Sequence, residues 1–326
     1  MNSILGNIMA ALLMIGQVSA ITTPPSGAIT VSKAGGGGKY MTIQAAINSL
    51  ADTGAVTIFI YPGTYTEMVY ITRTGPLTIY GSAASETTYT GNTVLLTNNV
   101  SAVAIGADDL SAPLRVHKSN FTLINVNVQN TFNTGIGVAV SYYGTYIGSY
   151  GCQFLAYQDT LLTETGEHYF ENTYIEGAVD YIFGQYSKAY FQSVILASIG
   201  HGYVTANGRA SSTDTGGYVF NGCTVTASSK AVSGTVGKVY LGRPWGAYAR
   251  VIYMYSDLTD VLNLAGWYEW TVGVYPSHAS FFEYNNSGAG AWNSQRANFS
   301  QEISATVANE YSLANFFSST SWILSL

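Results

Sequence analysis

The stretch "YGCQFLAYQDTLLTETGEHYFENTYIEGAVDYIFG", residues 150–184, places two aspartates among apolar and aromatic residues. They are Asp159 and Asp180, 21 residues apart, in a chain of which only 9% of residues are charged. The same stretch contains "FENTYI" (170–175) and most of "SYGCQF" (149–154), two short runs that resemble each other and recur elsewhere. The spacing of these runs decides how the chain folds.

Five such runs share one pattern, with a small or turn-forming residue in third place and an apolar residue in last place. The runs are "LINVNV" (123–128), "SYGCQF" (149–154), "FENTYI" (170–175), "FQSVIL" (191–196) and "FNGCTV" (220–225). The third places are Asn125, Gly151, Asn172, Ser193 and Gly222, and the last places are Val128, Phe154, Ile175, Leu196 and Val225. Successive runs lie 26, 21, 21 and 29 residues apart. A period in the twenties with strands and turns is typical of a solenoid.

Because the repeats carry strands and no helical partner, we predict an all-β fold, a parallel β-helix. An antiparallel sandwich with coincidentally similar strands is the alternative. Short flanking helices are expected at "MTIQAAINSLA" (41–51) and between Val307 and Phe317. Residues 21–326 are predicted to form a single domain.

A 21-residue separation corresponds to one coil, so Asp159 and Asp180 should stand side by side on one sheet face, about 4.8 Å apart. Two stacked carboxylates repel each other, and their pKa values should separate. Cys152 and Cys223 occupy the same register position 71 residues apart, about three coils or roughly 15 Å. That distance is too long for a disulfide, so we predict two buried thiols.

The N-terminus reads "MNSILGNIMAALLMIGQVSA", an apolar segment that ends in the small residues Val18, Ser19 and Ala20. We predict that residues 1–20 are a signal peptide, although no Lys or Arg precedes the apolar segment, and that the protein is secreted. No other segment has the length of a membrane span. Four Asn-x-Ser/Thr sequons agree with secretion and glycosylation, at Asn99, Asn120, Asn285 and Asn298. The net charge of −6 argues against nucleic acid or an anionic membrane as a partner.

Further motifs surround the two aspartates. They are "YPGTYTE" (61–67), "YQDTLL" (157–162), "GAVDYIFG" (177–184), "TANGR" (205–209), "LGRPW" (241–245) and "GW" (266–267). In this order they resemble the pectin methylesterases, the carbohydrate esterases of plant-cell-wall pectin, and most closely the fungal and related microbial type. The resemblance runs from roughly Ile29 to Trp322. It implies a right-handed, single-stranded, pectin-lyase-like β-helix that converts methyl-esterified pectin to pectate and methanol.

The resemblance also implies roles for individual residues. Asp180 matches the nucleophile, Asp159 the general acid and base, and Gln158 the amide donor to the oxyanion. Arg243 matches the partner of the nucleophile. Four residues match or neighbour the aromatic lining of the sugar groove: Tyr157, Phe183, Trp245 and Trp267. No metal or other cofactor is implied, the substrate is the polysaccharide itself, and we expect a monomer.

The chemistry explains these residue types. An ionised carboxylate can attack an ester carbonyl and form an anhydride-like intermediate. Arg243 would keep Asp180 ionised through a bidentate pair. Asp159 would then carry the raised pKa and donate a proton to the departing methanol. Other motif residues are expected to be structural: Gly63, Tyr65 and Glu67 at a coil edge, and Asn207 and Arg209 in a loop.

One position departs from the family pattern. The family has a second glutamine one coil before Gln158, and here Ile136 stands in its place. Isoleucine cannot donate a hydrogen bond, so we expect a weakened but active esterase.

Two other functions are considered. A polygalacturonase is suggested by "DD" (108–109) and "GHG" (200–202), but these lie 92 residues apart where about one coil is needed. A secreted pectin-binding protein that has lost catalysis is suggested by Ile136 alone. The absence of a G-x-S-x-G motif leaves a serine hydrolase without support.

Overall fold

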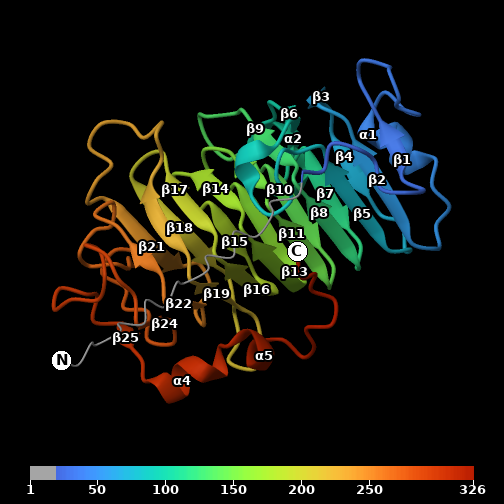
Figure 1. The fold of residues 1–326 in the computed structure, drawn as a ribbon. Helices are drawn as coiled ribbons and strands as arrows, with labels where there is room; N and C mark the ends of the chain where they lie inside the picture. Colours follow the sequence, from blue (N-terminus) through green and yellow to red (C-terminus); the bar gives the residue numbers. More distant parts are fainter. Residues whose placement is uncertain (1–19) are drawn as a thin grey trace, which may run out of the picture.

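The computed structural model describes residues 20–326, and the predicted signal peptide, apart from Ala20, lies outside the described residues. The chain coils through three stacks of parallel strands, which we call sheets 1, 2 and 3; sheets 1 and 2 are joined through a long strand (Figure 1). Every pairing between named strands in the described part is parallel, for example β11 with β8 and β12 with β14. The prediction of a parallel β-helix is confirmed, and the antiparallel sandwich is excluded.

Sheet 1 consists of β4 (Val69–Ile71), β7 (Leu114–His117), β10 (Val140–Tyr143), the first half of β13 (Leu161–Glu171), β15 (Ile182–Gly184), β18 (Gly202–Asn207) and β21 (Val239–Pro244). Sheet 2 consists of β1 (Ile29–Val31), β2 (Val56–Ile60), β5 (Leu77–Gly81), β8 (Phe121–Ile124), β11 (Ile147–Tyr150), the second half of β13, β16 (Tyr186–Gln192), β19 (Gly217–Asn221), β22 (Arg250–Met254), β24 (Ser280–Tyr284) and β25 (Ser300–Glu302). Sheet 3 consists of β3 (Gly63–Thr66), β6 (Val94–Asn98), β9 (Asn127–Asn130), β12 (Gln153–Leu155), β14 (Tyr174–Gly177), β17 (Ile195–Ser198), β20 (Thr224–Ala227) and β23 (Asp257–Leu258).

The five repeated runs lie directly above one another. Their first residues pair in succession across sheet 2: Leu123, Ser149, Phe170, Phe191 and Phe220. Their third residues all have a left-handed backbone, with φ between 48° and 61°. Gly and Asn adopt this conformation more readily than most residues, which explains why small, turn-forming residues recur there. At this position the chain turns from sheet 2 into sheet 3.

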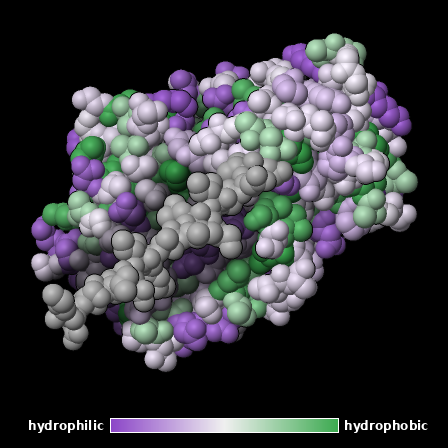
Figure 2. Space-filling view, viewed as in Figure 1, coloured by the Kyte–Doolittle hydropathy of each residue, from purple (hydrophilic) through white to green (hydrophobic). Residues whose placement is uncertain are grey.

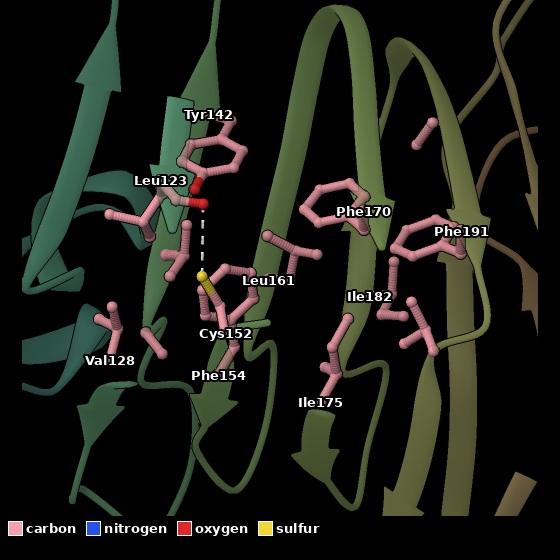
Figure 3. Close-up of a cluster of buried hydrophobic side chains, with 14 of the residues drawn as sticks. Leu123, Val128, Tyr142, Cys152, Phe154, Leu161, Phe170, Ile175, Ile182 and Phe191 are labelled. Atoms are coloured by element: carbon pink, nitrogen blue, oxygen red, sulfur yellow. Dashed lines mark hydrogen bonds between the residues drawn. The ribbon is translucent and has the colours of Figure 1, made fainter. Parts of the chain in front are cut away.

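Aromatic rings stack along the interior of the solenoid. The ring centroids of Phe170 and Phe191 are 4.6 Å apart, those of Phe191 and Phe220 4.4 Å, and those of Phe220 and Tyr253 4.4 Å. Figure 3 shows the first of these pairs and, on the other side of Leu161, the buried Cys152, whose Sγ lies 3.6 Å from the Leu123 carbonyl oxygen. Each coil therefore buries its apolar side chains against the next coil.

Both cysteines are buried free thiols, as predicted. Burial raises the pKa of each thiol to about 12. Neither Cys152 nor Cys223 therefore forms a reactive thiolate at ordinary pH.

The helices lie outside the coils. They are α1 (Ile43–Asn48), α2 (Ala102–Ile105), α3 (Asp108–Ser111), α4 (Ala305–Glu310) and α5 (Leu313–Phe316), with a 3-10 turn at Tyr89–Gly91. Both predicted helical segments are confirmed: residues 41–51 contain α1, and the segment from Val307 to Phe317 contains α5 and most of α4. Glu67 accepts hydrogen bonds from the amides of Ile43 and Gln44 at the start of α1, both at 3.0 Å, which confirms its structural role. On the face seen in Figure 1, hydrophobic residues lie in small groups between hydrophilic ones (Figure 2).

Candidate active site

Asp159 and Asp180 occupy equivalent places on successive coils. Gln158 and Val179 form a parallel bridge, and the Asp159 amide donates a hydrogen bond to the Val179 carbonyl at 3.0 Å. The predicted one-coil separation is confirmed. The expectation that both lie on a sheet face is wrong, because each lies in the turn that leads from sheet 3 into β13 or β15.

The backbone at both aspartates is left-handed, with φ of 62° at Asp159 and 49° at Asp180. This conformation costs roughly 1–2 kcal/mol for an L-residue, although Asp tolerates it better than most. Both side chains border one cavity. The fold therefore stabilises an unfavourable backbone at two successive coils, and the result is a pair of carboxylates in one place.

Arg243, on β21, binds Asp180 with two hydrogen bonds. Its Nε donates to Oδ1 at 3.0 Å and its Nη2 donates to Oδ2 at 2.6 Å. The guanidinium carbon lies 4.1 Å from the ring centroid of Tyr203 and 4.4 Å from that of Trp270. A guanidinium held by a bidentate carboxylate and two aromatic rings has little freedom to rotate. Arg243 therefore fixes the orientation of the Asp180 carboxylate.

The two aspartates are similarly buried but differ in their charged neighbours. Asp159 is 7% exposed and Asp180 is 5% exposed. Burial, together with the negative charges of Asp180 and Asp108, raises the pKa of Asp159 to about 8. Burial also raises the pKa of Asp180, but the hydrogen bonds and positive charge of Arg243 oppose that rise. Of the two carboxyl groups, Asp180 is therefore the one whose ionised form is favoured by a cation, and Asp159 is the one whose protonated form is favoured.

Gln158 precedes Asp159 and faces the same cavity. A parallel bridge joins Ile136 to Gln158, so Ile136 lies one coil earlier at the equivalent position. This register confirms the prediction that Ile136 lies one coil before Gln158. The cavity thus has an amide side chain on one coil and an aliphatic side chain on the coil before it.

The cavity has a volume of about 300 Å³. Its lining consists of Asp108, Ile136, Gln158, Asp159, Asp180, Phe183, Ala206, Arg243, Trp245 and Trp270. A second hollow of about 290 Å³ shares Trp245 and Trp270 with it and continues over residues 271–278. The two hollows adjoin at these tryptophans and are together called the groove, in which aromatic and aliphatic side chains surround a few polar groups. This composition suits a ligand with apolar faces and one reacting polar group.

Of the four aromatic residues predicted to line the sugar groove, two line the cavity and two do not. Phe183 and Trp245 line the cavity. Tyr157 is half-buried in the turn before Gln158 and is not part of the cavity lining.

The prediction that Trp267 binds substrate is wrong. Its side chain is 1% exposed, its Nε1 donates to Glu283 Oε1 at 3.0 Å, and its ring stacks on Phe281 with centroids 4.3 Å apart. Trp267 therefore belongs to the core. Trp270, three residues later and 40% exposed, lies in the groove instead.

Sequence reasoning also missed Asp108, Tyr203 and Ala206. In the sequence Asp108 stands out only as part of the "DD" pair, and no local signal links it to Asp159 or Asp180, which lie 51 and 72 residues away. Tyr203 and Ala206 lie on β18, where Ala206 pairs with Arg243 on β21.

Asn207 and Arg209 of the "TANGR" motif have structural roles, as expected. Buried Asn207 accepts from the Arg250 amide at 2.9 Å, and Arg209 donates to the carbonyls of Asp214, Tyr248 and Ser212.

Within residues 20–326 no group of three or more His, Cys, Asp or Glu side chains is arranged to hold a metal ion. No helix in this part of the chain is long and apolar enough to cross a membrane.

Known proteins with similar sequences are pectinesterases. The Pectinesterase family model matches residues 28–320. A pectinesterase from Aspergillus niger is 41% identical over 322 residues, which covers 95% of this chain and 96% of the relative. One from Aspergillus aculeatus is 40% identical and covers 97% of each chain.

Solved structures show the same fold. The pectin methylesterase from Aspergillus niger, in deglycosylated form, superposes with a TM-score of 0.83 at 39% identity, covering 88% of this chain and 93% of that one. The pectin methylesterase from carrot has a TM-score of 0.83 at 26% identity, covering 92% and 96%. The right-handed form of the β-helix is thereby established. Since the sequence motifs, the fold and relatives over nearly the whole length agree, this chain belongs to the pectinesterase family.

Proposed function

We propose that this protein hydrolyses the methyl esters of pectin to pectate and methanol, with Asp180 as nucleophile and Asp159 as general acid and base. Family membership supports the reaction class, a carboxylic ester hydrolysis. One observation carries the assignment of roles: within the described residues, Arg243 is ion-paired with Asp180, whereas Asp159 has no such partner. A carboxylate held ionised beside a protonated carboxyl group is the arrangement that nucleophilic ester hydrolysis requires.

In the first half of the reaction, a carboxylate oxygen of Asp180 attacks the ester carbonyl carbon and forms a new C–O bond. The carbonyl oxygen becomes an oxyanion, to which the Gln158 amide donates a hydrogen bond worth roughly 3 kcal/mol. When the oxyanion collapses, the bond to the methoxy oxygen breaks and Asp159 transfers its proton to that oxygen. Methanol leaves, and the galacturonate acyl group remains on Asp180 as an anhydride.

In the second half, ionised Asp159 takes a proton from water while the water oxygen attacks the galacturonate carbonyl carbon. The anhydride bond breaks, which restores the Asp180 carboxylate and leaves Asp159 protonated. The galacturonic acid formed loses its remaining proton to solvent. One ester bond and one water molecule are consumed, and both aspartates return to their starting forms.

The lining of the groove supports a polysaccharide substrate. Phe183, Trp245 and Trp270 present rings toward the cavity, and aromatic faces suit the CH faces of a sugar ring. Arg243 is the only cationic residue in that lining and is already paired with Asp180. A neutral, methyl-esterified sugar therefore fits the cavity better than an ionised one.

Ile136 supports a reduced rate. With an aliphatic side chain one coil before Gln158, one amide donor remains where the family pattern has two. Ile136→Gln should raise kcat for methanol release by about tenfold, well below the roughly 10²- to 10³-fold effect usual for one oxyanion donor, because Gln158 already supplies one amide. No gain in rate would remove this explanation.

The proposal extends to location and assembly. We propose that the protein is extracellular and acts as a monomer. The asparagines of all four sequons are exposed, as glycan attachment requires: Asn99, Asn120, Asn285 and Asn298.

Methanol release from highly methylated pectin by the purified protein tests the function. The wild type should release methanol, and Asp180→Asn should lose roughly 10³-fold or more in kcat, as expected for a nucleophile. Asp260→Asn, which alters an exposed turn residue, is the control and should retain wild-type activity. A pectin-binding protein would bind pectin and release no methanol, and a polygalacturonase would release reducing ends from pectate. Either result would contradict the proposal.

A further inference from the structure

Asp108 is a third carboxylate at the cavity. It begins α3 and lines the cavity together with Asp159 and Asp180. Within residues 20–326 no hydrogen bond or ion pair engages its side chain, and only its backbone carbonyl accepts a bond, from Ser111 Oγ at 2.7 Å. A half-buried carboxylate without a partner is unfavourable for folding, because desolvation is not compensated. A negative charge is favourable in the first turn of α3, but beyond this the described part of the chain provides no side-chain partner for Asp108.

The adjacent Asp109 behaves differently. It accepts two hydrogen bonds from Arg115, one from Ser141 Oγ at 2.6 Å, and contacts His117 Nε2 at 2.9 Å. These contacts join α3 to strands β7 and β10 of sheet 1. Of the two neighbouring aspartates, Asp109 thus attaches the helix to the sheet, whereas the side chain of Asp108 borders the cavity.

We propose that Asp108 is a positioning and specificity-determining residue of this site, acting by charge repulsion on Asp159 and on the free carboxylate of the product. The inference rests on the proposed function, because it needs Asp159 as the acid and galacturonate as the product. The neutral methyl ester does not experience this repulsion, whereas the ionised product does. A repulsive charge of this kind separates two ligands that differ only in one charge.

Four neighbouring groups influence the ionisation of Asp159. Asp180 and Asp108 oppose its ionisation, and Arg243 and the Gln158 amide favour it. The charge of Asp108 contributes to the raised pKa of Asp159, and burial raises the pKa of Asp108 itself.

The groups on the sheet 1 side of Asp108 do not compete for this role. Tyr143 on β10 is affected by Asp108 and Asp109, and burial together with nearby carboxylates raises the pKa of its hydroxyl to about 12, so it stays neutral. Arg115 and His117 are engaged by Asp109. The net charge that Asp108 adds to the cavity is therefore not cancelled by these neighbours.

The pH dependence of kcat/KM tests the effect on Asp159. This residue must be protonated when the ester binds, so kcat/KM falls as the pH rises through its pKa. Asp108→Asn should move this alkaline limb to lower pH by about one unit, because removing a like charge that borders the same cavity favours ionisation of Asp159. Asp108→Glu should restore the limb toward that of the wild type. Asp260→Asn removes the same charge at an exposed turn and should leave the limb unchanged.

Inhibition by pectate tests the effect on the product. Asp108→Asn should bind pectate several-fold more tightly than the wild type, both as an inhibitor and in calorimetry with the inactive Asp180→Asn background. A folded Asp108→Asn enzyme with the wild-type alkaline limb and wild-type pectate affinity would overturn the inference. If Asp108→Asn does not fold by circular dichroism, Asp108→Ser provides the same two measurements.

The two proposals fail in different ways. A wild type that releases no methanol contradicts the proposed function. If the wild type is active but Asp108→Asn changes neither the alkaline limb nor the affinity for pectate, only this inference is contradicted. In the absence of methanol release, calorimetry still decides whether Asp108 repels pectate, and unchanged affinity in Asp108→Asn refutes the repulsion.

Discussion

Removal of the Arg243 guanidinium is the most direct test of how this site divides the work between two aspartates. We consider Arg243→Gln, which keeps a polar side chain of similar length but removes the positive charge. The Asp180 carboxylate, with a side chain 8% exposed, would lose both of its hydrogen bonds to Arg243. It would then face Asp159 with no cation beside it.

The magnitude follows from the burial of the pair. Removing one partner of a buried ion pair typically costs 3–5 kcal/mol. The Arg243 side chain is 21% exposed, so solvent can compensate in part, and the lower end, about 3 kcal/mol, applies. If that energy is lost from the ionised nucleophile, kcat/KM should fall by about 10²-fold near neutral pH. The pKa of Asp180 should rise, because burial raises it and Arg243 no longer opposes the rise.

The sign of the pH effect is fixed by the role of Asp180. A nucleophile must be ionised, so the rate falls as the pH drops through its pKa, and a raised pKa moves this acid limb to higher pH. Methanol release should therefore be measured across the pH range for wild type, Arg243→Gln and Arg243→Lys. Lysine keeps the charge but lacks the bidentate fork, so Arg243→Lys should lose less activity than Arg243→Gln. Activity of Arg243→Gln within threefold of wild type, with an unmoved acid limb, would refute the assignment of Asp180 as the nucleophile.

Three further predictions concern Asp159, the two tryptophans and the aromatic stack. Asp159→Asn should abolish methanol release and stabilise the fold at about pH 8. The pKa of Asp159 in the folded protein, about 8, exceeds the ordinary 3.8, so the free energy of unfolding of the wild type falls by a few kcal/mol as the pH rises between these values. Urea unfolding of both proteins at several pH values would measure this difference. Trp270→Ala should lower kcat/KM with little change in the free energy of unfolding. Trp267→Phe should lower the free energy of unfolding by about 1–3 kcal/mol, because the hydrogen bond to buried Glu283 is lost, and should leave KM unchanged. The opposite pattern would reverse their roles. Phe191→Ala should cost about 3–5 kcal/mol in chemical denaturation, because its ring stacks on both neighbours, and a cost below 1 kcal/mol would contradict the stacking.

Much of the fold could be predicted because the solenoid repeats itself. The runs that begin at Phe170 and Phe191 have the same register in the sequence and in the hydrogen-bonded sheet. The requirement for a left-handed residue at each turn shows directly as Asn, Gly or Ser. Because these constraints act within one coil, they recur in the sequence as a regular pattern of residue types.

The site was predictable in part. Asp159, Asp180 and Gln158 lie one repeat apart or adjacent, so the period alone brings them together. The pairing of Arg243 with Asp180 came from the family motif, and the structure confirms it. Trp267 was misassigned because the sequence does not distinguish a tryptophan that turns into the core from one that turns into the groove three residues later.

The repeat can be read from the amino-acid sequence, and with it the coil, the turns and the placement of two carboxylates on successive coils, because each of these depends on residues within one period of each other. Tertiary structure alone decided which groups surround those carboxylates. Asp108 and Trp270 approach the cavity from a short helix and a long loop outside the repeat, and their positions depend on how those segments pack against sheet 1. Burial and neighbouring charge, which set the pKa of Asp159, are properties of that packing.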